Sequence, residues 1–586
     1  VEENHVRRVE KRTTALGEEN VRLEVKESWL GTAPNVYARG RLKMKQGMDG
    51  IQTHYFYEET DRYGALYKVT AETRIAGESV PGLSSRKVTY VSGQGNNMRY
   101  EQYARLADGA WSMTDASSYE YDVENRWVKR TRANGRVYER MMTCCGPLWE
   151  RDENGVTTSY SYNTARQLVE TIRSAVTDGE TMITPETITS YTRDALGKIT
   201  SLRRDAGPMT TVESREYDLL GRLIRETDIL GRTTVRSYSG DGLVETVTTP
   251  AGATLITRKS PSGTVVRRYG TGQQDILYTV EATAEGIRTT EAVPGGEGGE
   301  PRVVTGSSTV NGFGDLVRIA AANTLNGENV RTLAYDDKGR LIREQLADMA
   351  PTLYAYDAFG NRTRAIVALE DEPTILNSRI TDYAYVAESR EDGIYRLVSI
   401  TSYTSSGTPV LQKQAVLLSA LSSVLAGKNV MTDPRGQDTV EWTEDGGGSV
   451  RLQKKTVPGV GSVALTRVVD GFTTAVTGFD GATARRQRTY TETGITYADT
   501  DVRGNVFTAV CDIAGRIISG TDAAGNTTTY AYAQPFDLPT CVTNALGKTA
   551  CSVYDIRGRK EAEWGTAIQP AVYAYDAAGH IVSLST

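Results

Sequence analysis

The sequence predicts an all-β chain built from tandem repeats of short antiparallel strands. Three observations predict it: Tyr far outnumbers Phe, 32 to 7, a Tyr-Asp-x-x-Gly motif recurs along the chain, and turn signals fall about every 10 residues. Tyr in such excess is typical of broad, half-exposed sheet surfaces, where the ring packs and the hydroxyl finds a partner. Abundant Gly, 57 residues, and modest Pro, 17 residues, are typical of many strands joined by tight turns.

The repeat is defined by Tyr followed directly by Asp, with Gly three residues after the Asp. Tyr217 and Tyr238 are 21 residues apart, and the same spacing separates later pairs of copies. Between the full copies lie half-copies that lack the Tyr, such as those beginning at Asp228 and Asp522. The structural positions that this pattern predicts are Tyr121, Asp122, Tyr217, Asp218, Gly221, Tyr335, Asp336, Gly339, Tyr356, Asp357, Gly360, Tyr554, Asp555, Gly558, Tyr575, Asp576 and Gly579.

The chemistry of one unit predicts a hairpin. Asp at the first position of a type I turn accepts hydrogen bonds from backbone N–H groups of the turn. Gly three residues later supplies a left-handed backbone and closes the turn with a bulge. Pairs such as Tyr354 and Tyr356 are spaced by two, so both rings lie on one face of a strand. The resulting ladder of Tyr rings could form a binding groove, but packing of one repeat on the next is the simpler interpretation.

These motifs resemble the RHS/YD-repeat proteins, whose units read Tyr-Asp-x-x-Gly-Arg-Leu. The resemblance covers most of the chain from about Tyr119 onward and is carried best by residues 217–247, 333–363 and 511–584. It implies antiparallel strands coiled into a spiralling, hollow β-sheet shell, as in the cocoon of bacterial Tc toxins, Rhs effectors and teneurins. Such shells enclose a C-terminal toxic segment or present surfaces for adhesion.

The chain is expected to form one continuous shell with blocks of differing regularity. These are irregular N-terminal β-repeats at 1–110, a YD-repeat block at 111–293, a Gly/Glu loop at 294–301, a second YD-repeat block at 302–366, degenerate repeats at 367–500 and a C-terminal YD-repeat block at 501–586. Asp433-Pro434-Arg435-Gly436 resembles part of the self-cleavage motif of Rhs effectors, but Gln437 replaces the expected Leu. We interpret this stretch as an ordinary turn.

No site for chemistry is predicted. The three His, at positions 5, 54 and 580, are far apart, and neither a zinc-binding spacing nor a complete phosphate-binding Gly loop occurs. Most Asp residues are explained as turn residues, so no catalytic carboxylate pair can be chosen. We therefore predict no enzyme activity and no catalytic, cofactor-binding or metal-binding residues. The net charge of −6 without a basic stripe argues against a nucleic-acid partner, and no apolar run is long enough for a membrane span.

The five cysteines include two close pairs. Cys541 and Cys551 flank a predicted hairpin turn, but the simplest register places them on opposite faces, so a disulfide is not favoured. Cys144 and Cys145 are neighbours at a turn. A redox or metal site is one interpretation of that pair, and a buried or strand-edge pair is the simpler one.

The favoured function is a non-catalytic shell that encloses or carries a polypeptide, of the toxin-delivery type. Its partners would be further segments of its own polypeptide, such as a C-terminal core or toxin, or a capping chain. The last repeat reaches Thr586 without a cap, and exposed edge strands are disfavoured, so we expect the chain to continue or a partner to cover this end. The alternative is a secreted or cell-surface scaffold of a bacterium for adhesion or carbohydrate binding, with surface glycans as partners.

Overall fold

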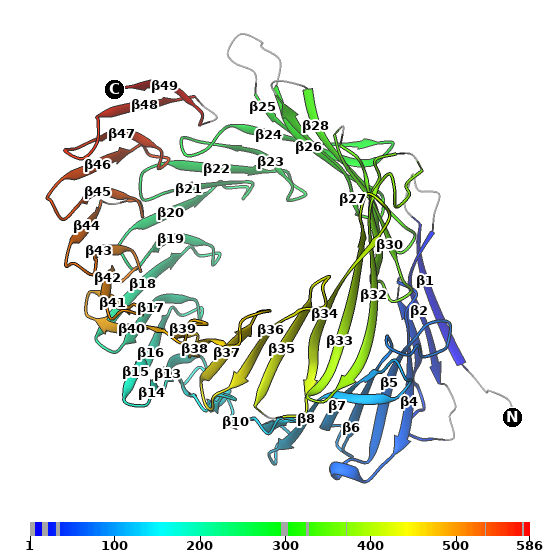
Figure 1. Ribbon diagram of the computed structural model, residues 1–586. Helices are drawn as coiled ribbons and strands as arrows, with labels where there is room; N and C mark the ends of the chain where they lie inside the picture. Colours follow the sequence, from blue (N-terminus) through cyan, green and yellow to red (C-terminus); the bar gives the residue numbers. More distant parts are fainter. Residues whose placement is uncertain are drawn as a thin grey trace.

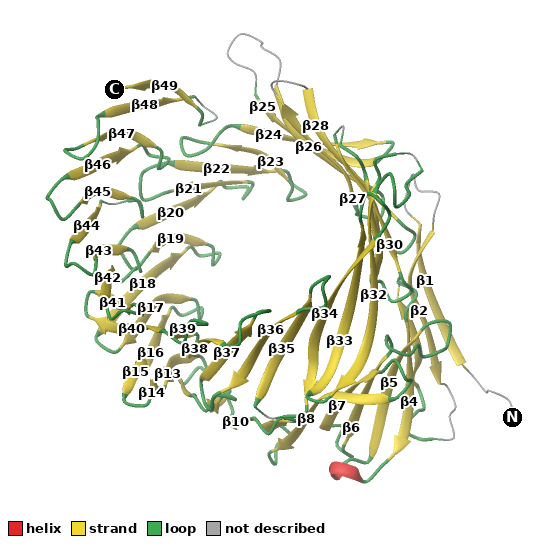
Figure 2. Cartoon of the chain, in the orientation of Figure 1, coloured by secondary structure: helices red, strands yellow, loops and turns green. Residues whose placement is uncertain are grey.

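The protein is almost entirely β-strand, which confirms the predicted fold class. A computed structural model describes residues 6–14, 21–30, 35–47, 49–294, 303–323, 327–347, 349–370, 372–422, 424–533, 535–576 and 579–586. Within these residues the only helical element is a short 3-10 turn at Arg62–Gly64 (Figure 2). Beyond Pro294, the predicted Gly/Glu loop lies outside the described residues.

The strands follow one another at short intervals along the chain. The first group comprises β1 (Val6–Thr14), β2 (Val21–Leu30), β3 (Arg41–Gly47), β4 (Gln52–Glu59), β5 (Tyr67–Arg74), β6 (Ser85–Val91), β7 (Asn97–Arg105), β8 (Trp111–Tyr121), β9 (Trp127–Arg132), β10 (Val137–Met142), β11 (Pro147–Arg151), β12 (Thr157–Tyr162), β13 (Leu168–Arg173), β14 (Val176–Asp178), β15 (Thr181–Thr184), β16 (Thr187–Arg193), β17 (Ile199–Ala206), β18 (Met209–Tyr217), β19 (Leu223–Thr227), β20 (Thr233–Tyr238), β21 (Val244–Thr248), β22 (Thr254–Lys259), β23 (Val265–Tyr269) and β24 (Ile276–Thr283). The second group comprises β25 (Gly286–Val293), β26 (Val303–Val310), β27 (Leu316–Asn323), β28 (Gly327–Tyr335), β29 (Leu341–Leu346), β30 (Thr352–Tyr356), β31 (Arg362–Val367), β32 (Arg379–Arg390), β33 (Gly393–Tyr403), β34 (Pro409–Ala420), β35 (Leu425–Thr432), β36 (Asp438–Asp445), β37 (Val450–Thr456), β38 (Ala464–Val469), β39 (Phe472–Thr477), β40 (Thr483–Thr491), β41 (Gly494–Thr500), β42 (Val506–Asp512), β43 (Ile517–Thr521), β44 (Thr527–Tyr532), β45 (Pro539–Thr543), β46 (Thr549–Tyr554), β47 (Lys560–Trp564), β48 (Ala571–Tyr575) and β49 (Ile581–Ser585).

Forty-seven of the described strands form one antiparallel sheet in which each strand pairs with the next along the chain. The exception is the hairpin of β14 and β15, a separate two-stranded sheet inserted between β13 and β16, which pair directly. Because consecutive strands run in opposite directions, successive hairpin turns alternate between the two edges of this long ribbon. One edge carries the turns that follow Tyr, and we call it the Tyr-Asp edge. The other carries the intervening turns, and we call it the half-copy edge.

The ribbon curves around a central axis and comes back alongside itself, so that the C-terminal strands lie beside β13–β23 (Figure 1). We call residues 80–275 the first winding and residues 380–565 the second winding. Hydrogen bonds join the two at sequence separations near 300: Arg173 bonds Asp470, 297 residues away, and Arg232 bonds Asp537, 305 residues away. In these contacts the half-copy edge of the first winding meets the Tyr-Asp edge of the second.

Most strand side chains are half-buried, because a single-layered sheet has no second sheet to cover either face. Fully buried apolar residues gather in small clusters, and two of these lie where the windings meet. One contains Leu106, Ala387 and Ile394. The other contains Val156 and Phe472 among its members. Buried apolar side chains therefore help to join one winding to the next.

The register of the last hairpins corrects the expectation for Cys541 and Cys551. The two residues are direct cross-strand partners and form a disulfide. The reason is the bulge at the turn: Gly547 N–H donates to Asn544 O and Asn544 N–H donates to Lys548 O, so one extra residue enters the loop. That residue shifts the register by one and brings both cysteines to the same face. The prediction of opposite faces was wrong.

Candidate functional site: the repeat unit and the seam between windings

Each repeat is organised by the carboxylate of its Asp. At Asp218, Oδ1 accepts the backbone N–H groups of Leu220 and Arg222, both at 2.9 Å. Gly221 N–H donates to Asp218 O at 2.9 Å, and Gly221 has φ +74°, a conformation in which a side chain would be strained. The second carboxylate oxygen accepts Arg222 Nε at 2.7 Å. One Asp thus holds both the backbone and the cationic side chain of its own turn.

The same arrangement recurs at the other predicted positions. Asp122, Asp336 and Asp555 hold the Arg four residues later, Asp357 holds Asn361, and Asp576 holds His580. Positive φ angles occur at Gly339, Gly360, Gly558 and Gly579. In the worn copy after Tyr121, Asn125 takes the left-handed position with φ +61°, as Asn does more readily than other non-glycine residues.

The Arg of one repeat also contacts the Tyr of the next. The Arg222 guanidinium lies 4.3 Å from the centroid of the Tyr238 ring, and Tyr238 Oη donates to Leu223 O at 3.1 Å. Arg340 with Tyr356, Arg516 with Tyr532 and Arg559 with Tyr575 repeat this stacking at 5.0, 4.6 and 4.5 Å. The ring is therefore fixed by a cation–π contact on its face and a hydrogen bond at its tip.

All predicted repeat tyrosines use their hydroxyl in this way. Each donates to a backbone carbonyl of the preceding strand: Tyr121 to Asn97, Tyr217 to Ile199, Tyr335 to Leu316, Tyr356 to Leu341, Tyr554 to Pro539 and Tyr575 to Lys560. The Tyr two positions earlier binds a carboxylate instead, as Tyr354 does at Glu344 and Tyr573 at Glu563. The Tyr ladder joins repeat to repeat, and its hydroxyls are occupied in doing so.

We call the line of contact between the two windings the seam. The inserted hairpin of β14 and β15, residues 176–184, binds the second winding across this seam, and we call it the clasp. Asp178 accepts two hydrogen bonds from Arg467, at 2.9 and 2.6 Å, across 289 residues of sequence. Thr184 Oγ1 donates to Asp470 Oδ2 at 2.6 Å, and Arg488 Nε donates to the carbonyl of Ile183 at 2.7 Å. The hairpin extends from the half-copy edge of the first winding and binds the Tyr-Asp edge of the second.

Apolar packing lies beneath this polar clasp. Val176 and Ile183 from the hairpin pack with Val156, Val469 and Phe472. Val469 is 0% exposed and Phe472 is 9% exposed. Burying these side chains between two windings stabilises the contact by the hydrophobic effect. The surrounding ion pairs alone would stabilise it only weakly.

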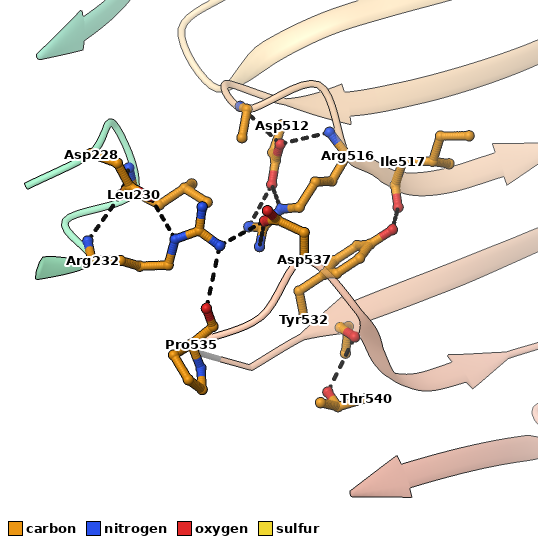
Figure 3. A network of polar contacts seen from close by, with 12 residues as sticks. Asp228, Leu230, Arg232, Asp512, Arg516, Ile517, Tyr532, Pro535, Asp537 and Thr540 are labelled. Carbon is orange, nitrogen blue, oxygen red and sulfur yellow. Dashed lines mark hydrogen bonds and ion pairs between the residues drawn. The ribbon is translucent and has the colours of Figure 1, made fainter. Parts of the chain in front are cut away.

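Further along the seam, a single carboxylate bridges the windings. Figure 3 shows Asp537 between Arg232 of the first winding and Arg516 of the second. Arg232 Nη1 donates to Asp537 Oδ1 at 2.8 Å, while its Nε donates to its own turn at Asp228 Oδ2 at 2.7 Å. Near the start of the seam, Arg136 pairs in the same sense with Asp445 of the second winding. An Arg that follows a half-copy Gly can thus donate hydrogen bonds both to the Asp of its own turn and to a residue of the neighbouring winding.

The electrostatics of these sites favour ionised groups. Hydrogen bonds from Arg467 hold the pKa of Asp178 below its ordinary range, against a smaller opposing effect of burial. The backbone N–H and guanidinium of Arg222 do the same for the pKa of Asp218. Burial raises the pKa of Tyr238, which therefore stays protonated and able to donate. Asp178 and Asp218 are thus poor proton donors near neutral pH.

Within the described residues, no group of three or more His, Cys, Asp or Glu side chains is arranged to hold a metal ion. No helix in the same part of the chain is long and apolar enough to cross a lipid bilayer. Asp433, the position that resembles a self-cleavage motif, forms a turn of the ordinary repeat type: Gly436 N–H donates to Asp433 O and Gln437 N–H donates to Asp433 Oδ1, both at 2.9 Å.

Sequence reasoning missed the residues that join one repeat or winding to another. Glu150, Glu344 and Glu563 each lie ten residues before a Tyr-x-Tyr pair and accept its first hydroxyl. That fixed interval was a usable signal. The seam residues Arg136 and Asp537 carried no signal, because their partners lie about 300 residues away in the sequence.

Comparison with known proteins gives one family and a set of distant folds. The RHS repeat family model matches residues 217–254. No curated protein matches the chain. Among solved structures, TcdB2-TccC3 is 12% identical with a TM-score of 0.29, covering 94% of this chain and 37% of that one. The Tc holotoxin pore of Photorhabdus luminescens is 11% identical with a TM-score of 0.30, covering 96% of this chain and 35% of that one.

The chain spans little more than a third of the length of these two structures, and a likeness at this level says nothing of its activity or partners. The repeats themselves are more informative. Residues 217–254, which match the family model, contain the Asp218 turn and the stacking of Arg222 on Tyr238. The same contacts recur in the copies at Asp336 and Asp555. Residues 217–254 therefore match an RHS repeat, and the contacts of that repeat recur in other copies along the chain.

Proposed function

We propose that this chain is the wall of a non-catalytic RHS/YD-repeat shell that encloses or carries a polypeptide segment, as in toxin delivery. The observation that supports it best is the seam. A ribbon that only presented a binding face would not need its edges joined, whereas a container needs a wall without openings between its windings. Here the second winding is fastened to the first at several places, including a direct backbone hydrogen bond from Ala107 N–H to Ala387 O at 2.9 Å.

The repeat chemistry supports a structural role rather than catalysis. The Asp carboxylates of the repeats are used as acceptors for turn N–H groups and cationic side chains. Interactions of this kind lower a carboxyl pKa, whereas a general acid needs a raised one. The proposed partners are further segments of the same polypeptide, such as a C-terminal core or toxin, or a capping chain. We place the protein outside a bacterial cell, secreted or at the surface, with no cofactor and no nucleic-acid partner.

A density map of the purified native particle, with the intact mass of the same sample, tests this proposal. The expected result is a closed wall around density that belongs to polypeptide beyond the 586 residues of this chain. Limited proteolysis should then leave that extra polypeptide intact until the wall is unfolded. An open spiral with solvent inside, and a mass that the wall alone accounts for, would contradict the container.

A second candidate is a carbohydrate-binding or adhesive scaffold, favoured by one pocket of about 400 Å³ near β35 and β36. Trp442 forms part of its lining, beside the carboxylates of Asp392 and Glu444. Lys428 Nζ bonds Asp392 at 2.6 Å, and Trp442 Nε1 bonds Glu444 at 2.8 Å. An aromatic ring flanked by fixed carboxylates is a suitable surface for the apolar face and hydroxyls of a sugar ring.

A glycan array with the wild-type chain and Trp442→Ala distinguishes this candidate from the container. Binding that Trp442→Ala abolishes, with Trp564→Ala as a control on an exposed Trp elsewhere, would support the scaffold. Equal binding by all three proteins, or none by any, would remove the pocket as a reason to favour it.

A further inference from the structure

We propose that Cys144 and Cys145 form a reversible thiol–disulfide couple, a modification site for molecules that carry a disulfide bond. The two Sγ atoms lie 2.9 Å apart in the turn between β10 and β11, and neither forms a disulfide in the structure. Cys144 is exposed and Cys145 is half-buried. The chain therefore holds two thiols in contact at its surface.

The turn itself keeps the two thiols together. Thr143 N–H donates to Gly146 O at 2.7 Å, and Cys145 N–H donates to Thr143 Oγ1 at 3.2 Å. Arg126 Nη1 donates to Thr143 O at 2.8 Å from the preceding hairpin. Gly146 is also required, since a Cβ there would lie 2.4 Å from Tyr162 Oη. These contacts fix the backbone on both sides of the cysteines and hold the two Sγ atoms within reach of each other.

The position of the turn leaves the thiols accessible. It follows an even-numbered strand and so belongs to the Tyr-Asp edge of the first winding. The second winding docks on the opposite edge, at residues such as Asn154 and Arg136. An incoming disulfide can therefore reach Cys144 without displacing another part of the described chain.

Nearby charge suits the chemistry. The guanidinium of Arg126 lies close enough to Cys144 to interact with it, and Arg166 interacts in the same way with Cys145. The thiolate is the reacting form of cysteine. The hydrogen bond with Cys144 raises the pKa of Cys145 despite Arg166. Cys144, the more exposed of the two, is the thiol placed to react first.

The reaction is an ordinary exchange in two steps. The Cys144 thiolate attacks a disulfide RS–SR, forming a mixed disulfide and releasing one RS⁻. The Cys145 thiolate then attacks Cys144 Sγ, forming the Cys144–Cys145 bond and releasing the second RS⁻. The pair loses two electrons and two protons, and the reagent gains them as two RSH. The reverse reaction with two RSH restores both thiols.

The other cysteines make a useful contrast. Cys541 and Cys551 are already bonded as cross-strand partners, and Cys511 is buried and unpaired. A formed disulfide is typical of proteins in oxidising surroundings, where the reagents this exchange needs are present. A bond between adjacent residues closes a small strained ring, and strained, exposed disulfides are the ones that are readily reduced. The Cys144–Cys145 bond should therefore open well before the Cys541–Cys551 bond.

The test is to equilibrate the full chain with graded ratios of oxidised to reduced glutathione, quench with acid, alkylate and analyse the peptides by mass. The peptide with Cys144 and Cys145 should lose two hydrogens and resist alkylation at high oxidised glutathione. It should recover both thiols at a ratio that leaves Cys541–Cys551 bonded. Alkylation of both thiols at every ratio, a persistent glutathione adduct on Cys144, or disulfide-linked dimers would overturn the proposal.

A second measurement tests the adjacency of the thiols without oxidation. Phenylarsine oxide bridges two neighbouring thiols with loss of water, so the chain reduced at a ratio that leaves Cys541–Cys551 bonded should bind one equivalent. Cys144→Ser and Cys145→Ser should each abolish that binding, whereas the matched control Cys511→Ser should leave it unchanged. Binding that survives either single variant would contradict a paired site even if the chain is folded.

Discussion

The half-copy edge binds a neighbouring winding in the first winding but not in the second, within the described residues. Comparing the two regions shows how one turn motif can form either a contact or an unpaired edge. In the first winding this edge faces the second winding, and Arg232, which follows the half-copy Gly231, reaches Asp537. In the second winding the equivalent turn carries Asn526, whose amide donates to its own Asp522 at 2.9 Å. Asn505 folds back on Asp501 in the same way.

The difference lies in the length and charge of one side chain. The Asn amide donates a hydrogen bond to the Asp carboxylate of its own turn, and its short side chain reaches no further. Arg satisfies the Asp through Nε and has further N–H groups to offer a neighbour. An edge whose half-copy turns carry Asn therefore presents few unsatisfied hydrogen-bond donors. An edge whose half-copy turns carry Arg can bind a second edge. We infer that the residue after the half-copy Gly helps decide whether an edge joins another winding.

The largest expected effect comes from the apolar part of the seam. Phe472→Ala should lower the free energy of unfolding by about 3–5 kcal/mol, because a buried ring is replaced by a cavity. The matched control is Phe507→Ala, since Phe507 is 42% exposed and is not a member of the apolar cluster at the seam. Chemical denaturation followed by circular dichroism measures both. Equal losses for the two variants would show that the seam is not where burial matters.

Removing a repeat Tyr hydroxyl should lower the free energy of unfolding by less than Phe472→Ala does. The loss should be the same on either edge. Tyr238 lies on the free Tyr-Asp edge of the first winding and Tyr532 on the joined one, yet each donates to a carbonyl 15 residues earlier. Tyr238→Phe and Tyr532→Phe should each destabilise by about 1 kcal/mol, the usual contribution of such a bond. Thermal unfolding of both variants provides the measurement. A much larger loss for Tyr532→Phe would mean that the repeat bond and the seam are coupled.

The clasp should weaken in acid because of Asp178. Its pKa in the folded chain lies below the ordinary value of 3.8, chiefly through hydrogen bonds from Arg467. A lowered carboxyl pKa stabilises the fold above the unfolded value, and this contribution is lost as the pH falls through the folded value. Asp178→Asn should therefore lower the thermal midpoint at pH 6, and the difference from wild type should shrink as the pH is taken below 3.8.

Asp499→Asn is the matched control for that experiment. Asp499 also accepts two hydrogen bonds from one Arg, Arg486, at 2.6 and 2.7 Å, but both residues belong to the second winding. Hydrogen exchange should rise at residues 176–184 in Asp178→Asn and not in Asp499→Asn. The same increase in both variants would show that the clasp depends on general ion pairing and not on the bond across the seam.

The sequence predicted what is local and missed what depends on register or distance. The Asp218 turn was predictable, because its Asp, its Gly and all their partners lie within five residues. The Cys541–Cys551 pairing was predicted wrongly, since the one residue added by the bulge reversed the faces. Arg222 and Arg232 have the same local motif, yet one stacks on Tyr238 and the other crosses the seam. The Tyr before Asp218, absent before Asp228, indicates that the two Arg lie on opposite edges, but the partner of Arg232 depends on the curvature of the whole ribbon, which no short segment encodes.

The smallest expected effect is also the sharpest test of the comparison. Arg232→Asn should recreate the self-contained turn seen at Asn526, so Asp228 keeps a partner while Asp537 loses one from the other winding. Because that pair is partly exposed, the loss of stability should be at most about 1 kcal/mol. Hydrogen exchange should nevertheless rise at residues 535–538, which the lost bond no longer holds.

The reciprocal change supplies the control for this variant. Asn526→Arg places the longer side chain on the free half-copy edge, where no second winding is available in the described chain, so neither stability nor exchange at residues 535–538 should change. If Arg232→Asn also leaves that exchange unchanged, the Asp537 bridge does not hold the windings together. The joint would then rest on the clasp and its apolar core, and the residue after the half-copy Gly would have no part in deciding which edge is joined.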